Sequence, residues 1–198
     1  MRTSLLACLA CVGLAVFAAV AEEPAAPKAP SPQLVARTTL VMKDLESQNY
    51  SRILDQMHHA TTDTAAENAA DRRSIAAALQ LLSTRFGKLE GYELAQARDA
   101  CVCVSLSMAS DEYWAKDAET DHGAVVAFTT RHAKMHAGIV RITETNRGRD
   151  WIRSIEIGVP PTVPGANDQM TRIARELIER MHTVTRKPKD PNAPPKPD

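Results

Sequence analysis

The sequence GIVRITETNRGRDWIRSIEI, residues 138–157, decides the fold. On both sides of the tetrapeptide NRGR at 146–149, β-branched or aromatic residues alternate with polar ones. Alternation with period two is typical of a strand that buries one face. Gly148 can adopt the positive φ that a tight turn requires. The stretch therefore predicts a hairpin of two antiparallel strands, over 139–145 and 151–159.

The same alternation extends upstream of this hairpin. It begins near Tyr92 and continues in residues 124–134, and it is clearest between these two segments, in residues 101–108. In that last segment the apolar residues take one face: Val102, Val104, Leu106 and Met108. Two cysteines and two serines take the other face. We therefore expect a meander of antiparallel strands, which ends at Pro160 because proline donates no ladder hydrogen bond.

Helical periodicity precedes the predicted sheet. Apolar residues recur at i, i+4, i+7 and i+11 from Ile75 to Phe86, and Gly87 follows where a helix C-cap is expected. Similar spacing predicts a helix over 33–47 and a short helix that carries residues 53–57. The polar residues 61–68 are expected to form a loop.

These elements together indicate an α+β domain over 33–161, in which N-terminal helices pack on a curved antiparallel sheet. An extra amphipathic helix is expected at 166–184. Proline and alanine dominate 22–32, and proline dominates 187–198. We expect the first of these segments to be a linker and the second a disordered tail.

Residues 1–21 have the pattern of a cleavable signal peptide. Arg2 precedes an uncharged apolar run from Leu5 to Val20, and the small residues Ala19 and Ala21 form a cleavage signature. The apolar run is short for a membrane anchor, and no positively charged stop sequence follows it. We therefore expect the protein to be exported, to the periplasm or by secretion, with no membrane span after cleavage.

Charge and cysteine content exclude several function classes. Without Arg2, the 24 Lys and Arg residues become 23, against 24 Asp and Glu residues. A nearly neutral chain has no electrostatic surface for nucleic acid and no broad attraction to anionic membranes. Loss of Cys8 and Cys11 with the leader leaves only two cysteines, which cannot build a disulfide scaffold. Stability must therefore come from an apolar core.

Three segments carry a resemblance to a known superfamily: SQNYSRILDQM at 47–57, RFGKLEGYEL at 85–94 and the closing hairpin at 138–157. Their order, and the position of Trp151 shortly after Gly148, resemble the NTF2-like, or cystatin-like cone, superfamily. Small exported bacterial domains of unassigned function are the most similar members. The resemblance implies a cone with a pocket on its concave side, and a sheet that pairs two subunits as a homodimer.

Five residues are expected to line that pocket: Val102, Val104, Leu106, Phe128 and Trp151. We interpret the chain as a non-catalytic module that binds a small apolar ligand or a protein partner. The alternative is a small isomerase or dehydratase whose acid or base is His132 or Asp99. No partner carboxylate can be assigned to His132 from its spacing, so the simpler expectation is a solvent-facing residue, or one that makes a single hydrogen bond near the rim.

No metal or cofactor site is expected. His132 and His136 would bind one metal together on a helix, but in an extended strand they lie about 13 Å apart. The adjacent His58 and His59 are expected to mark a polar helix end. None of these histidines belongs to a complete ligand set.

Cys101 and Cys103 are a possible redox pair, because both lie on one strand face. Residues two apart on a strand are about 6.5 Å apart, near the upper edge of disulfide geometry. The alternative is that two small residues fill a closely packed face of the sheet. A redox-active C-x-x-C motif would lie at a helix start, and no such helix is predicted here.

Overall fold

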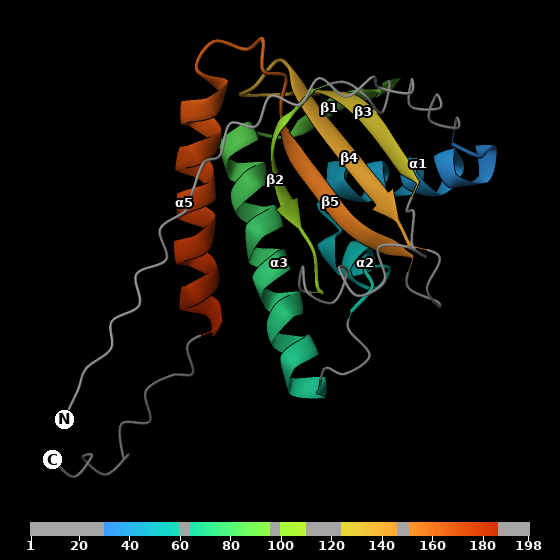
Figure 1. Cartoon of the computed structure of the whole chain (residues 1–198), viewed down its shortest axis with the longest axis vertical. Helices are drawn as coiled ribbons and strands as arrows, with labels where there is room; N and C mark the ends of the chain where they lie inside the picture. The colour runs from blue at the N-terminus through green and yellow to red at the C-terminus, as the bar shows by residue number, and fades with distance from the viewer. Residues whose placement is uncertain (1–29, 60–63, 96–99, 110–123, 146–150, 186–198) are drawn as a thin grey trace, which may run out of the picture.

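The computed structural model describes residues 30–59, 64–95, 100–109, 124–145 and 151–185 (Figure 1). Within this part of the chain, three helices are followed by five strands and a last helix. The helices are α1 (Pro32–Glu46), α2 (Tyr50–Leu54), α3 (Ala65–Phe86) and α5 (Ala166–Thr185). The strands are β1 (Leu89–Ala95), β2 (Val102–Leu106), β3 (Val125–His132), β4 (Gly138–Glu144) and β5 (Ile152–Val159).

Helix α3 begins earlier than the apolar periodicity predicts. The Thr64 side chain accepts a hydrogen bond from the backbone N–H of Glu67, and the Glu67 carboxylate accepts one from the backbone N–H of Thr64. This reciprocal capping box satisfies backbone donors that a helix start leaves free. The prediction of a loop over 61–68 is therefore wrong for residues 65–68, where alanines and a cap, not an apolar stripe, favour the helix.

The five strands form one antiparallel sheet in the order β1-β3-β4-β5-β2. The predicted pairing of β4 with β5 is confirmed, although their connection at 146–150 lies outside the described residues. The expected meander holds for β3, β4 and β5 but is wrong for β2. This strand pairs with β5, at the opposite edge of the sheet from β1.

The sheet has two chemically different faces. Its inner face packs on the helices and contributes apolar residues to the core, among them Leu106, Val126, Phe128, Val140, Ile142, Ile155, Ile157 and Val159. The outer face carries the residues between these, including Cys103, Arg141 and Glu156. The alternation within each strand therefore places the core on one side. The other side carries polar side chains and the cysteines, together with the buried Ala127 and Ile139.

The helices complete an α+β fold, as the sequence predicts. Helices α1, α2 and α3 contribute Val41, Ile53 and Leu79 to the same core as the inner face. Helix α5 runs beside α3 and also contacts β2 and β5 (Figure 1). It places Met170, Ile173 and Leu177 in the core. Among the described helices, none has the length and apolar character that crossing a bilayer requires.

Gly158 permits the close approach of β2 to β5. It stands opposite Cys103 in the ladder, and a methyl group added to it would lie only 2.6 Å from the Cys103 Cα and would also contact the Val102 carbonyl. Both obstacles are backbone atoms, which cannot move aside without disturbing the ladder. Glycine at this position is therefore required by packing.

Gly158→Ala should lower the free energy of unfolding by about 1–3 kcal/mol, because the added methyl group overpacks the β2–β5 ladder. Chemical denaturation measures this change. Gly91→Ala on edge strand β1 is the matched control, since its nearest neighbour is the flexible Arg131 side chain at 3.4 Å. The control should change the stability by less than about 0.5 kcal/mol. Equal effects of the two variants would contradict the packing role of Gly158.

Candidate functional site

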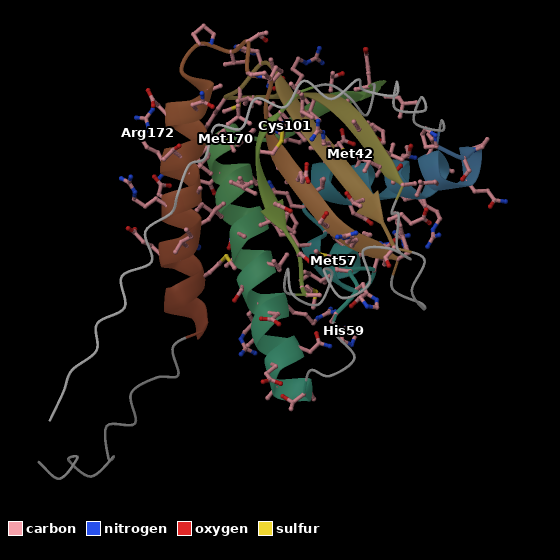
Figure 2. All side chains as sticks on the ribbon, in the orientation of Figure 1. Met42, Met57, His59, Cys101, Met170 and Arg172 are labelled. Carbon is pink, nitrogen blue, oxygen red and sulfur yellow. A yellow bond between two sulfur atoms is a disulfide. The ribbon has the colours of Figure 1, made fainter. Side chains whose placement is uncertain are left out.

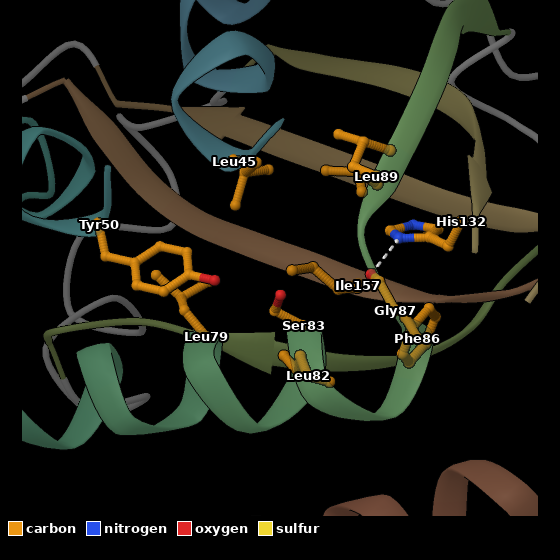
Figure 3. A pocket seen from close by; sticks show the side chains of 11 residues that line it. Leu45, Tyr50, Leu79, Leu82, Ser83, Phe86, Gly87, Leu89, His132 and Ile157 are labelled. Carbon is orange, nitrogen blue, oxygen red and sulfur yellow. Dashed lines mark hydrogen bonds between the residues drawn. The ribbon is translucent and has the colours of Figure 1, made fainter. Parts of the chain in front are cut away.

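A cavity of about 40 Å³ lies between the helices and the inner face of the sheet (Figure 3). It is lined by residues from α1, α2, α3 and four strands and by Gly87: Leu45, Tyr50, Leu79, Leu82, Ser83, Phe86, Gly87, Leu89, His132, Val140 and Ile157. Seven of these eleven side chains are leucine, isoleucine, valine or phenylalanine. The cavity is therefore an apolar space with a few polar groups in its wall.

Three polar side chains face this space: Tyr50, Ser83 and His132. Tyr50 and His132 lie at opposite ends, and Ser83 points between them from α3 (Figure 3). The Ser83 hydroxyl accepts a hydrogen bond from Gln48 Nε2 at 3.0 Å and donates none to the residues that the structure describes. Within the described part of the chain, the Tyr50 hydroxyl forms no hydrogen bond with another side chain or the backbone. The two hydroxyls can therefore form hydrogen bonds with a bound ligand.

His132 makes hydrogen bonds at both ring nitrogens. Nδ1 lies 3.4 Å from the Gly87 carbonyl oxygen, and Nε2 lies 3.1 Å from the Thr130 hydroxyl. A carbonyl oxygen only accepts, so Nδ1 carries the proton. Nε2 of the neutral ring then accepts from Thr130. This neutral tautomer uses both nitrogens within the protein.

Burial favours the neutral form of His132. Only 8% of the residue is exposed, and the Phe86 ring packs edge-on against it with centroids 5.2 Å apart. Desolvation lowers the pKa of His132 below its ordinary value of 6.5, and the Gly87 hydrogen bond and the Glu90 charge oppose this shift less strongly. The expectation of a solvent-facing His132 is therefore wrong. The residue does lie on the same strand face as Val126, Phe128 and Thr130, as the alternation predicts.

The other predicted site residues are not gathered around the cavity. Asp99 lies outside the described residues. Phe128 packs on Tyr92, with ring centroids 5.8 Å apart. Trp151 donates to Gln56 Oε1 and stacks under the Arg37 guanidinium.

The remaining three predicted lining residues are Val102, Val104 and Leu106, on edge strand β2. All five residues predicted to line a pocket therefore lie outside the wall of this cavity. For the three β2 residues the physical reason is the strand order, because β2 pairs at the edge of the sheet beside β5 and not beside β1 and β3. Spacing along the chain does not reveal that Leu45 and Leu82 meet Val140 across the fold.

Cys101 and Cys103 form a disulfide, and their Cα atoms are 5.4 Å apart. This separation is shorter than the strand spacing predicts, because Cys101 precedes β2 and lies outside its ladder. It falls within the ordinary disulfide range. A redox role for the pair stays a prediction.

His58 and His59 follow α2 in an extended segment, and not at a helix end as expected. Met57 forms a bridge with Ile152, and His59 forms one with Met108. The two imidazole rings stack with centroids 6.3 Å apart. In the part of the chain that the structure describes, no three His, Cys, Asp or Glu side chains are grouped to hold a metal ion.

The lowered pKa of His132 predicts how stability depends on pH. As the pH falls through about 6.5, the unfolded chain binds a proton at this imidazole, whereas the folded protein binds it only at lower pH. The contribution of His132 to the free energy of unfolding should therefore be fully present above about pH 6.5 and should decrease as the pH falls below it. Denaturation curves from about pH 7 to pH 5 measure the decrease, and NMR titration of the ring protons measures the pKa.

His132→Asn should reduce this pH dependence, because asparagine retains a donor for Gly87 but does not titrate. The matched control is His136→Asn, which alters an exposed residue and keeps His132. If His132→Asn leaves the pH dependence of the wild type intact, the buried imidazole is not its source.

Comparison with known protein families, with curated proteins and with solved structures finds no match for this chain. The cavity and its side chains are therefore the basis for assigning a function.

Proposed function

We propose that the chain is an exported, non-catalytic NTF2-like module whose cavity binds a small apolar ligand that carries one polar group. The observation that carries this proposal is the apolar cavity with the hydroxyls of Tyr50 and Ser83 in its wall. Apolar walls with a few oriented polar groups are typical of small-molecule sites. The apolar walls favour a ligand with an alkyl group, and the two hydroxyls favour a ligand that can also form a hydrogen bond.

The size of the cavity limits the ligand. A buried water needs about 10–15 Å³, so 40 Å³ holds about three waters or a short alkyl group. A small alcohol, or the end of a longer aliphatic molecule, fits this space. The protein would then recognise the end of a chain and leave the rest of a longer ligand outside.

A catalytic role for the same cavity has less support. A general base needs a free lone pair, and the Nε2 lone pair of His132 accepts from Thr130. Among the described lining residues there is no carboxylate. The buried carboxylate Asp44 is not in the wall and faces the Arg52 guanidinium at 3.6 Å. These contacts favour a binding module over an isomerase that uses His132.

Filling the cavity should abolish binding. 4,4,4-Trifluorobutan-1-ol is a suitable probe, because its fluorine NMR signal shifts and broadens when the molecule is held. So few atoms support a Kd on the order of 1 mM. Ser83→Leu should eliminate the effect, whereas Thr84→Leu should preserve it. Thr84 is the matched control because it is an exposed neighbour on α3 outside the wall.

Tyr50→Phe separates the polar contribution from the apolar one. It should weaken binding of the alcohol about fivefold, because a neutral hydrogen bond contributes roughly 1 kcal/mol. Unchanged binding by Ser83→Leu would exclude this cavity as the site.

Export is a separate part of the proposal and is supported by the pattern of residues 1–21. Expression of the full chain in a bacterial host should give a mature protein that begins at Glu22 in the periplasm or medium, as measured by mass spectrometry. Ala21→Arg should block cleavage, because the position before the cut requires a small residue. Thr3→Ala, far from the cleavage signature, is the control. An unprocessed wild-type protein confined to the cytoplasm would contradict export.

A further inference from the structure

The disulfide between Cys101 and Cys103 lies on the outer face of the sheet, opposite the core and the cavity. Figure 2 shows Cys101 beside the start of β2. Cys103 is the second residue of this edge strand and shares its face with Ser105. Both cysteines are half-buried. A partner can therefore approach the sulfur atoms without opening the hydrophobic core.

Strand β5 presents no side chain beside Cys103 on this face. Directly opposite residues of an antiparallel pair project from the same face, and the residue opposite Cys103 is Gly158. Glycine has no side chain to stand over the disulfide. The close contact that makes Gly158 necessary for packing therefore also keeps β5 from covering the bond.

The bond is not needed to hold β2 in place. It closes a loop of residues only two apart in sequence, and short loops give the least stabilisation in the chain-entropy account of disulfides. Strand β2 is already held by pairing along its length with β5, from Val102–Val159 to Leu106–Ile155. Leu106 is also buried in the core. Reduction of the bond should therefore leave the domain folded. A disulfide that takes part in exchange must meet this condition.

From this placement, we propose that Cys101 and Cys103 form a thiol–disulfide exchange centre that passes its disulfide to a dithiol in another protein. A substrate thiolate attacks one sulfur atom, the Cys101–Cys103 bond breaks, and a mixed disulfide forms. The released cysteine thiolate takes up a proton. The second substrate thiolate then attacks the mixed disulfide and releases the other cysteine.

The electrons balance over these steps. The substrate dithiol loses two electrons and becomes a disulfide, and the cysteine pair gains them and becomes two thiols. A more oxidising protein disulfide would restore the pair by the same exchange in reverse. This chemistry uses the outer face and does not depend on the proposed ligand cavity, so either proposal can fail alone.

The test uses the purified, oxidised chain and a reduced peptide with two cysteines. The chain should convert the peptide to its disulfide at a rate roughly tenfold above that of the Cys101→Ser/Cys103→Ser variant. In glutathione buffers, alkylation and mass spectrometry should show the pair reduced at millimolar reduced glutathione. Circular dichroism should then show a folded protein with an unfolding temperature within about 3 °C of the oxidised form.

A shifted pair is the matched control. Cys101→Ser/Ser105→Cys keeps two cysteines two residues apart on the same face but places both inside β2, where the strand spacing of about 6.5 Å hinders the bond. It should oxidise the peptide no faster than the double serine variant.

Three outcomes would overturn the proposal. The first is a bond that resists millimolar glutathione. The second is peptide oxidation equal to that of the double serine variant or of the shifted pair. The third is loss of the fold on reduction, which would make the bond a structural link.

Discussion

The register of β5 is the constraint on which the rest of the structure depends. This strand joins β4 on one side and β2 on the other. Its alternation directs Ile155, Ile157 and Val159 into the core and places Glu156 and Gly158 on the outer face of the sheet. Because side chains alternate with period two, a slip of one residue would turn the apolar set outward. The same register places Ile157 in the cavity wall and Gly158 beside the disulfide.

A second junction connects the helices to this sheet. Helix α3 ends at Phe86, and Gly87 turns the chain with φ +83°, which favours glycine. The Phe86 carbonyl accepts from the Lys134 N–H, and the Gly87 carbonyl accepts from His132. These bonds tie the end of α3 to the β3–β4 connection. His132 therefore has a structural role in the cavity wall. This role is sufficient to explain a buried histidine there without catalysis.

Much of the fold could be predicted from the sequence, because strand alternation and helical spacing are local properties. The segments around Ile75–Phe86 and 138–157 predict their elements correctly. The early start of α3 had a signal in the TAAE motif at 64–67, a capping box that apolar periodicity does not reveal. The position of β2 had no local signal, since pairing with β5 is a contact between segments far apart in the chain.

The sequence by itself determined the α+β class, the inner and outer faces of the strands, and the close spacing of the two cysteines. Only the tertiary structure decided which side chains enclose a cavity, that His132 is buried and uses both nitrogens, and that Gly158 stands opposite Cys103. The physical reason is the separation along the sequence between the residues that interact. Period and capping act between residues a few positions apart, whereas a cavity or a strand neighbour depends on which distant segments pack together.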